Sequence, residues 1–315
     1  MPSSSPPTKR REASLDELRE WSTAVQFSFI EALPIVTGWT ALDAVFHGGT
    51  SLSMAWRSPR YSEDLDFLLN REIASDEDRL NRLFGRIQTR MRESLMLTHP
   101  GLELSIQNRT RAGNPLVHFR FTGSRESILQ HAIVKAEFWP VDEAYLRRID
   151  TAQVHPSRRG AIVTRSASEL PVATLRAILA DKLTALATRP YLKWRDLFDM
   201  NFLWAHREDS PAEMAQRFLH HVSAYQPIQG LSARDALAHW VQEFSQDPGR
   251  ARAIAAAERD LRPWLPQTLW QALGPNGAAK LLDETCERLT LTIQAIDALD
   301  PEAPVPFVVG PKARG

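Results

Sequence analysis

Apolar residues recur along the chain with two different periods, and these periods predict where helices and strands lie. From Leu15 to Ile35 they recur at three- and four-residue steps, which predicts an amphipathic helix. The apolar run at Asp64–Leu69 contains no Gly or Pro and predicts a strand. Leu102–Asn108 and Leu116–Thr122 flank a turn with Gly and Pro and predict a hairpin, and Ala132–Trp139 predicts a further strand.

A second helix is predicted between the first strand and the hairpin, with Ser75 as its N-cap. Four arginines form a basic stripe beside its apolar face. This stripe has two interpretations, a solvated helix surface or a strip that follows the phosphates of an RNA acceptor. The apolar face comprises Leu80, Leu83, Phe84, Ile87 and Met91, and the stripe comprises Arg79, Arg82, Arg86 and Arg90.

The second half of the chain is predicted to be mainly helical after a short strand at Ala161–Thr164. One helix is expected from about Pro171, and the later helical segments are broken by Pro and Gly. These later segments are expected at 212–225, 232–246, 251–264 and 278–299. The predicted organisation is a disordered N-terminus at 1–14, a core domain at 15–165, a helical domain at 166–300 and a flexible tail at 301–315.

Composition narrows the class of protein. The chain has 315 residues, 43% of them hydrophobic, which is ample for a buried core, and its formal net charge is zero. Any nucleic-acid binding must therefore come from a local basic patch. Cys286 is the only cysteine, which excludes an intramolecular disulfide and a cysteine-based metal site. No apolar run reaches membrane-spanning length and the first residues lack the apolar segment of a secretory signal, so we expect a cytoplasmic protein without membrane contact.

Two acids in the first predicted strand are the main candidates for chemistry. Asp64 and Asp66 are two residues apart, so both carboxylates would stand on the same face of the strand. Like charges this close repel unless a cation lies between them, and Mg²⁺ favours carboxylates completed by substrate phosphates. A glycine turn lies upstream, where backbone N–H groups could approach phosphates and two hydroxyls could add donors. It consists of Gly48, Gly49, Thr50 and Ser51.

Each of these two motifs alone has an ordinary explanation, as a simple turn and as acids on a solvated strand edge. Their combination resembles the GG[ST]…Dx[DE] signature of the polymerase-beta-like nucleotidyltransferases. The fuller string GGTSL…RYSEDLDF resembles KGGTAL…R(F/Y)SEDLDF of the AbiEii/AbiGii nucleotidyltransferase toxins. One departure is His47, which stands where that family generally carries Lys. The fold that this resemblance implies is α/β (α+β), a nucleotidyltransferase core with a small mixed sheet followed by a helical C-terminal domain.

The resemblance extends to two further stretches. KAEF resembles a K(x)E segment and implies that Glu137 is a third metal carboxylate; a Lys–Glu cross-strand pair or a solvent-facing sheet is the alternative. LRAILADKLTALATR resembles L(x)EILAEKLxALxxR, which places Lys182 in the active site. Lys182 also falls in the apolar stripe of its helix, where a lysine needs a partner or must extend to the edge of the stripe.

A last stretch, KWRDLFD, resembles the family segment K(x)RDLYDL. The resemblance implies that Asp196 closes the active site and that Arg195 or Arg189 contacts phosphate. Alternatively, Asp196 favours the helix dipole, and Arg195 pairs with Asp199 one turn later. We interpret Asp199 as structural.

Taken together, the sequence predicts an Mg²⁺-dependent (or Mn²⁺-dependent) nucleotidyltransferase that uses an NTP. Asp64, Asp66 and Glu137 would hold the metal, and Asp196 could accept the proton of the acceptor hydroxyl. The resemblance implies a toxin with a separately encoded antitoxin and the 3′ end of tRNA as acceptor. Two alternatives stay open, a small-molecule nucleotidyltransferase of the antibiotic-modifying kind and a catalytically idle nucleotide-binding module.

Overall fold

The computed structural model shows two compact units. The described residues are 10–111, 113–114, 116–158, 165–206, 209–223 and 230–299. The expected strand at Ala161–Thr164, the expected tail at 301–315 and the first nine residues lie outside these ranges. Unit 1 comprises the described residues within Met1–Ala55, Glu63–Leu146 and Gln153–Val172; unit 2 comprises those within Trp56–Ser62, Arg147–Ala152 and Ala173–Gly315.

A mixed β-sheet forms the centre of unit 1. Within the described residues, seven strands join it in the order β3-β4-β5-β2-β1-β9-β6. Strand β2 runs parallel to β5, and β1 runs parallel to β9, while β1–β2, β3–β4 and β4–β5 are antiparallel. The strands are β1 (Ala44–His47), β2 (Leu65–Asn70), β3 (Glu103–Asn108), β4 (Val117–Ser124), β5 (Ala132–Val141), β6 (Thr151–Val154) and β9 (Leu170–Ala173), with β7 (Ser157–Arg158) and β8 (Arg165–Ser166) as a separate pair.

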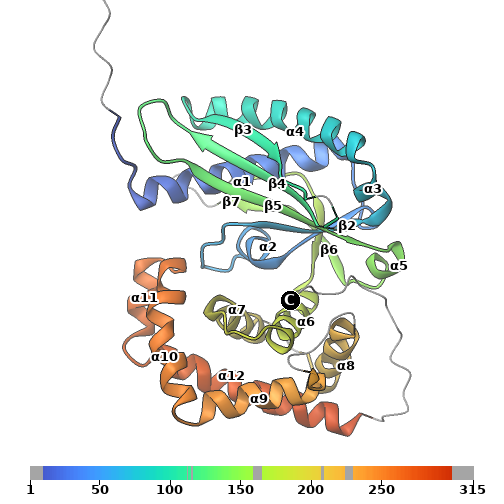
Figure 1. Ribbon diagram of the computed structural model, residues 1–315, viewed down its shortest axis with the longest axis vertical. Coiled ribbons are helices and arrows are strands. Elements are labelled where there is room, and N and C mark those ends of the chain that lie inside the picture. The colour runs from blue at the N-terminus through green and yellow to red at the C-terminus, as the bar shows by residue number, and fades with distance from the viewer. Residues whose placement is uncertain are drawn as a thin grey trace, which may run out of the picture. The chain divides into compact units, whose positions relative to one another are not determined.

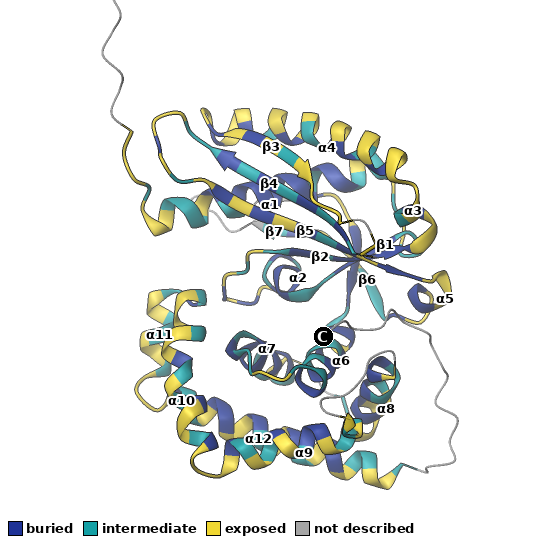
Figure 2. Cartoon of the chain, viewed as in Figure 1, coloured by how far each residue is buried: buried dark blue, intermediate teal, exposed yellow. Residues whose placement is uncertain are grey.

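The two long helices of unit 1 cover one face of this sheet (Figure 1). Helix α1 spans Leu15–Thr37 and begins with a capping box, in which Ser14 and Glu17 each satisfy the other's backbone N–H. Helix α4 spans Glu77–Thr98, and its buried residues lie on the side toward the sheet while its outer side is exposed (Figure 2). The shorter helices are α2 (Gly48–Met54), α3 (Arg71–Ser75) and α5 (Glu143–Leu146).

The predicted N-cap of α4 is wrong by one residue. Asp76 caps α4, and its carboxylate accepts a 2.8 Å hydrogen bond from the backbone N–H of Arg79. Ser75 instead ends the short helix α3, and its hydroxyl donates to the carbonyl of Glu72. The sequence pattern does not reveal the short helix α3, and this is why it places the cap one residue too early.

A cluster of phenylalanines fills the space between the helices and the sheet. Phe46, Phe67 and Phe138 sit at matching positions on β1, β2 and β5, with ring centroids 4.8 Å and 5.1 Å apart. Phe29 of α1 and Phe84 of α4 both contact Phe138 edge-on. Because aromatic rings bury large apolar areas, this cluster holds the three central strands in one register.

The opposite face of the sheet is polar, as the alternation in β5 predicts. Val134, Ala136 and Phe138 are buried, while Lys135 and Trp139 between them are exposed and Glu137 is half-buried. The hairpin of β3 and β4 and the strand β5 are confirmed at the predicted positions. The prediction of an α/β fold with a mixed sheet and a helical C-terminal part is therefore confirmed.

Unit 2 is built mainly from helices around a buried tryptophan. Trp194 is fully buried, and its ring N–H donates a 2.8 Å hydrogen bond to the carbonyl of Ala253. The C-terminal helix α12 packs against α7, α8 and α9. The helices are α6 (Leu175–Thr188), α7 (Trp194–Ala205), α8 (Pro211–Val222), α9 (Ala233–Ser245), α10 (Gly249–Asp260), the 3-10 turn η2 (Arg262–Trp264), α11 (Gln267–Leu273) and α12 (Gly277–Ala298). No helix in the described ranges combines the length and apolar character needed to cross a membrane.

The helix expected from about Pro171 begins later than predicted. Pro171 lies inside β9, where Val172 pairs with Phe46 of β1. Thr174 is the N-cap of α6 and its hydroxyl accepts from the backbone N–H of Ala177. Since a first-turn proline and an extended proline share the same φ, proline alone could not distinguish the two positions.

The phenylalanine cluster yields a prediction about stability. Replacing Phe67, which is 1% exposed, with Ala should lower the free energy of unfolding by about 3–5 kcal/mol, because it leaves a cavity between two stacked rings. Urea unfolding followed by circular dichroism measures the change. Leu97→Ala is the matched control, since Leu97 is 81% exposed and its truncation should have little effect. Equal midpoints for the two variants would contradict a core role for Phe67.

Candidate active site

The two candidate acids lie on the polar face of the unit 1 sheet. Asp64 directly precedes β2 and Asp66 is its second residue, and both side chains are half-buried. Leu65 between them is fully buried, so the strand alternates as predicted. Around Asp66 the register forms a row across four strands. In order along β1, β2, β5 and β4, this row consists of His47, Asp66, Glu137 and His118.

Glu137 stands next to Asp66 in this row. The two residues pair in register on adjacent parallel strands, which places their side chains on the same face. In the ranges that the structure describes, no group of three or more His, Cys, Asp or Glu side chains converges closely enough to hold a metal ion. The role of Glu137 as a third metal ligand therefore stays a prediction.

The pair Asp64 and Asp66 fits a magnesium ion by its chemistry. Both donors are hard carboxylate oxygens on one face, and Mg²⁺ in nucleotide sites commonly takes one or two carboxylates together with phosphates and water. The ammonium of Lys135 on β5 lies 3.9 Å from a carboxylate oxygen of Asp64, so a cation already approaches this acid. The sequence does not indicate Lys135 as a site residue, because the pattern suggests that it pairs with Glu137.

The glycine segment begins helix α2 and touches the second acid. Gly48 has φ +76°, a left-handed conformation that favours glycine. A Cβ at this position would also lie 2.3 Å from a carboxylate oxygen of Asp66, so no side chain fits there. The position therefore needs glycine for its backbone and for its lack of volume, and it brings the chain directly against Asp66.

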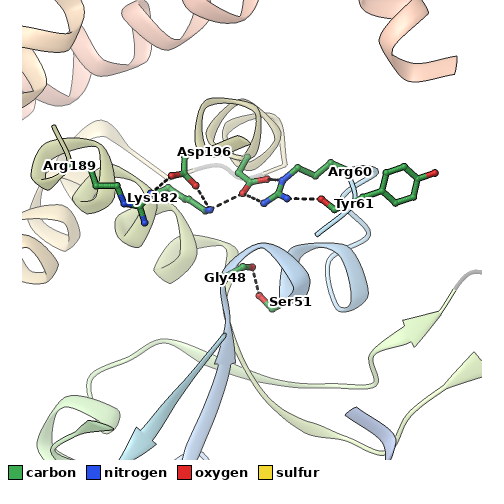
Figure 3. A network of polar contacts seen from close by, with 8 residues as sticks. Gly48, Ser51, Arg60, Tyr61, Lys182, Arg189 and Asp196 are labelled. Carbon is green, nitrogen blue, oxygen red and sulfur yellow. Dashed lines mark hydrogen bonds and ion pairs between the residues drawn. The ribbon is translucent and has the colours of Figure 1, made fainter. Parts of the chain in front are cut away.

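The two hydroxyls of this segment donate hydrogen bonds to backbone carbonyls of the protein. Thr50, 1% exposed, donates to the carbonyl of Asp64. Ser51, fully buried, donates a 2.8 Å hydrogen bond to the carbonyl of Gly48, as Figure 3 shows. Each hydroxyl has one hydrogen, so neither is left to donate to a phosphate in this arrangement. The donors that remain are the first backbone N–H groups of α2, which by position have no acceptor within the helix.

Unit 2 contains a buried ion network that includes Lys182. The ammonium of Lys182 on α6 lies 2.5 Å from Asp196 and 2.9 Å from Asp199, both on α7. Arg189, the residue after α6, contacts the other oxygen of Asp196 at 2.5 Å. Arg60 binds Asp199 through two guanidinium nitrogens, and both residues are buried (Figure 3). Lys182 is therefore a partnered lysine and does not extend to the edge of its stripe.

These contacts fix the protonation states of the central pair. Burial lowers the pKa of Lys182, but the carboxylates of Asp196 and Asp199 outweigh it and hold that pKa above its usual range. Burial likewise raises the pKa of Asp196, yet Lys182 and Arg189 outweigh burial and hold it well below the usual range. Asp196 is therefore a weak proton acceptor. Its geometry suits a positioning role, in which it orients Lys182.

The network carries a surplus of positive charge. Three cations, Lys182, Arg189 and Arg60, meet two carboxylates, which leaves one net positive charge. Arg189 is its most exposed member, with 37% of its side chain accessible. This network of unit 2 is thus suited to an anion.

The structure differs from the sequence predictions at Arg195. The alternative pairing of Arg195 with Asp199 is wrong, since Asp199 is bound to Arg60 and Lys182. The guanidinium of Arg195 instead lies over the ring of Trp264, 4.0 Å from its centroid. The structural interpretation of Asp199, which is 0% exposed, agrees with its contacts. Arg60 was missed, although the string RYSEDLDF that carried the resemblance begins with it.

The arginine stripe lies away from the acids. Its four arginines are exposed on the outer side of α4, whereas the buried side of α4 packs against the phenylalanine cluster. The acids occupy the other face of the same sheet. We therefore interpret the stripe as a solvated helix surface.

The chain is similar to known proteins in its sequence and in its fold. The family model described as "Nucleotidyl transferase AbiEii toxin, Type IV TA system" matches residues 40–273. A structure from H. pylori described as a nucleotidyltransferase is 17% identical, with a TM-score of 0.53 over 91% of this chain and 99% of that one. JHP933 from Helicobacter pylori is 17% identical, with a TM-score of 0.51 over 90% and 95%. MenT4, a nucleotidyltransferase toxin from Mycobacterium tuberculosis, is 17% identical, with a TM-score of 0.48 over 89% and 93%. No curated protein matches the chain.

Breaking the buried network should destabilise the protein. Asp199→Asn leaves the buried Arg60 and Lys182 without one of their carboxylates, and we expect a loss of about 3–5 kcal/mol in the free energy of unfolding. Chemical denaturation measures it. Asp297→Asn is the control, because Asp297 pairs with Arg234 at the surface and its loss should change little. A loss no larger than that of the control would contradict a structural role for Asp199.

The lowered pKa of Asp196 predicts how stability changes in acid. The carboxylate stabilises the folded state fully above its ordinary pKa of 3.8, and this contribution is lost as the pH falls toward the lowered folded-state pKa. Between pH 5 and pH 2, Asp196→Asn should therefore lose less stability than the unaltered protein. Thermal melts across this range test the difference. Parallel curves would show that the Asp196 contacts do not depend on its charge.

Proposed function

The chain belongs to the AbiEii family of nucleotidyltransferase toxins, and from this premise we propose that it transfers a nucleoside monophosphate from an NTP to the 3′ end of tRNA. The observation that carries the proposed chemistry is the placement of Asp64 and Asp66 on one sheet face, with Gly48 directly against Asp66. Membership of the family identifies an enzyme of the nucleotidyltransferase class. The metal, the acceptor and the residue roles below are parts of the proposal.

Asp64 and Asp66 are the proposed magnesium ligands, with Glu137 as a candidate third. When bound, Mg²⁺ or Mn²⁺ would supply positive charge that stabilises the phosphates during transfer. Two features of the chain support this pair: the buried Leu65 fixes both acids on the same face, and the hydrogen bond from Thr50 to the Asp64 carbonyl ties α2 to the start of β2.

The proposed phosphate-binding segment is Gly48, Gly49, Thr50 and Ser51. Its backbone N–H groups, at the start of α2, are the donors that we propose for the β- and γ-phosphates. The hydroxyls of Thr50 and Ser51 stabilise this backbone through their hydrogen bonds to the carbonyls of Asp64 and Gly48. Gly49, Thr50 and Ser51 are buried as whole residues, so the half-buried Gly48 is the most accessible part of the segment.

Unit 2 supplies the proposed positive charge for the leaving pyrophosphate. We assign this role to Lys182, with Arg189 and Arg195 as further phosphate contacts. Lys182 stays protonated because its two carboxylate partners raise its pKa. Asp196 is a proposed positioning residue. Because its oxygens are held by Lys182 and Arg189, we do not assign it the proton of the acceptor hydroxyl.

The partners in this proposal are an NTP, tRNA and a separately encoded antitoxin, in a protein of the cytoplasm. The toxin–antitoxin description of the family supports the antitoxin. The tRNA acceptor rests on the resemblance to the family.

The proposal predicts that each metal acid is essential. Asp64→Asn and Asp66→Asn should each lower transfer of label from a labelled NTP to total tRNA by at least about 100-fold, since each removes a ligand charge from the reacting phosphates. Each of the four NTPs is tested in turn with Mg²⁺. Asp297→Asn, a surface acid outside the site, is the matched control and should keep full activity.

Each alternative gives a distinct result. Release of pyrophosphate with a small-molecule acceptor, without label on tRNA, would contradict the tRNA proposal. It would indicate a small-molecule nucleotidyltransferase of the antibiotic-modifying kind. Nucleotide binding without transfer to any acceptor would indicate an idle binding module. Full activity in both asparagine variants would overturn the assignment of the metal acids.

A further inference from the structure

A cationic hollow lies beside the candidate acids in unit 1. It has a volume of about 700 Å³ and opens over the ends of β3, β4 and β5. Four of its lining residues are basic and none is acidic. The basic residues are Arg109, Arg111, Arg120 and Lys135; the others are Asn108, Thr110, His118 and Ile133.

Most of this positive charge is not neutralised within the protein. In the part of the chain that the structure describes, Arg109, Arg111 and Arg120 form no ion pair. Arg109 donates to the neutral side chain of Gln107 at 2.6 Å. The Nε atom of Arg120 is buried without a hydrogen-bond partner. Unpaired guanidinium groups that line a concave surface are typical of sites that bind phosphate.

The hollow adjoins the acids on the side away from the glycine segment. Lys135 lines the hollow and lies 3.9 Å from Asp64, and His118 lines it opposite Glu137. In the strand order β3-β4-β5-β2-β1, the hollow lies over β3 to β5, the acid pair belongs to β2, and the glycine segment follows β1. The acids therefore lie between two separate places suited to phosphate.

This order matters because nucleotidyl transfer is an in-line reaction. The attacking oxygen and the leaving pyrophosphate lie on opposite sides of the phosphorus that is transferred. If the triphosphate lies at the glycine segment, the acceptor approaches from the other side of the acids, where the hollow is. A cationic antibiotic would be repelled there, whereas a nucleic-acid strand carries one phosphate per nucleotide.

We propose that the hollow lined by Arg109, Arg111, Arg120 and Lys135 binds the phosphate backbone of the acceptor strand next to its reactive 3′ end. The inference rests on the proposed function, because it takes the glycine segment as the site of the triphosphate. The bond that forms joins the 3′ oxygen of the strand to the α-phosphorus. The bond to pyrophosphate breaks, and the hydroxyl proton leaves to solvent. The hollow holds the strand and takes no part in these bond changes.

The test compares two triple variants that remove the same charge. The hollow variant removes three of the four basic side chains that line the hollow: Arg109→Ala/Arg111→Ala/Arg120→Ala. The α4 variant removes three exposed arginines on the opposite face of the sheet: Arg79→Ala/Arg82→Ala/Arg86→Ala. Binding of a fluorescent single-stranded RNA of twelve nucleotides to the full chain is measured by anisotropy between 50 mM and 200 mM salt. Circular dichroism confirms that both variants fold.

The hollow variant should bind at least about tenfold more weakly at low salt, and the slope of log affinity against log salt should fall by about 2. The α4 variant should change affinity by less than about twofold. Equal weakening in both variants would overturn the proposal in favour of unspecific surface charge, and so would no weakening in either.

A second readout separates this inference from the proposed function. In the transfer assay, the hollow variant should raise KM for the RNA acceptor and leave KM for the NTP unchanged. Transfer to RNA with unchanged acceptor KM would overturn the hollow alone. RNA binding that depends on the hollow in a protein without transferase activity would support the hollow and overturn the proposed reaction. Transfer to a cationic small molecule that the hollow variant performs equally well would overturn the acceptor assignment.

Discussion

The register of β1, β2 and β5 is the constraint on which the candidate site of unit 1 depends. On one face, Phe46, Phe67 and Phe138 stack in a row. On the other face, each ring has a polar neighbour in sequence: His47 follows Phe46, Asp66 precedes Phe67, and Glu137 precedes Phe138. Because side chains alternate, a slip of one residue would carry the acids into the aromatic core. The hydrophobic effect that fixes the rings therefore also fixes the acids, although no acid contributes to the core.

In unit 2, a charged lysine, Lys182, lies largely buried among helices. Burial of a lone ammonium would cost several kcal/mol and would favour its neutral form. Asp196 and Asp199, one turn apart on α7, both contact Lys182. Arg60 and Arg189 add two positive charges, so the network as a whole keeps one net positive charge. The result is a lysine that stays protonated in a place where water is scarce. Little solvent screens the net positive charge of this network, which favours an anion nearby.

Much of the fold and part of the candidate site could be predicted from the sequence, because local patterns determine them. The period-2 run around Asp66 and the alternation around Glu137 gave the strands and their outward-facing residues. The start of α6 could not be predicted from Pro171, because proline fits an extended strand as well as a first helical turn. Nor could the partner of Asp199 be found, since Arg60 is distant in sequence and only the fold brings it near.

The resemblance identified the family from motif residues, and the match over residues 40–273 confirms that identification. It could not show that the hydroxyls of Thr50 and Ser51 face inward, because a motif records residue types and not the direction of a hydrogen bond. It also did not reveal the cationic hollow. The arginines of the hollow belong to the β3–β4 hairpin and its loop, outside every motif, and they gather only when the sheet has formed.

The close contact between Gly48 and Asp66 has a practical consequence for work with a toxic enzyme. Most inactive controls change the charge of a carboxylate, and so they alter metal affinity and electrostatics together. At Gly48 the lack of a side chain is what matters. A single methyl group there would displace the Asp66 carboxylate, although every ionisable group would remain in the sequence. An alanine there would displace the acid and strain the left-handed backbone while leaving every charge in place. Under the proposed function, this substitution would give an inactive protein with an unaltered net charge for expression in living cells.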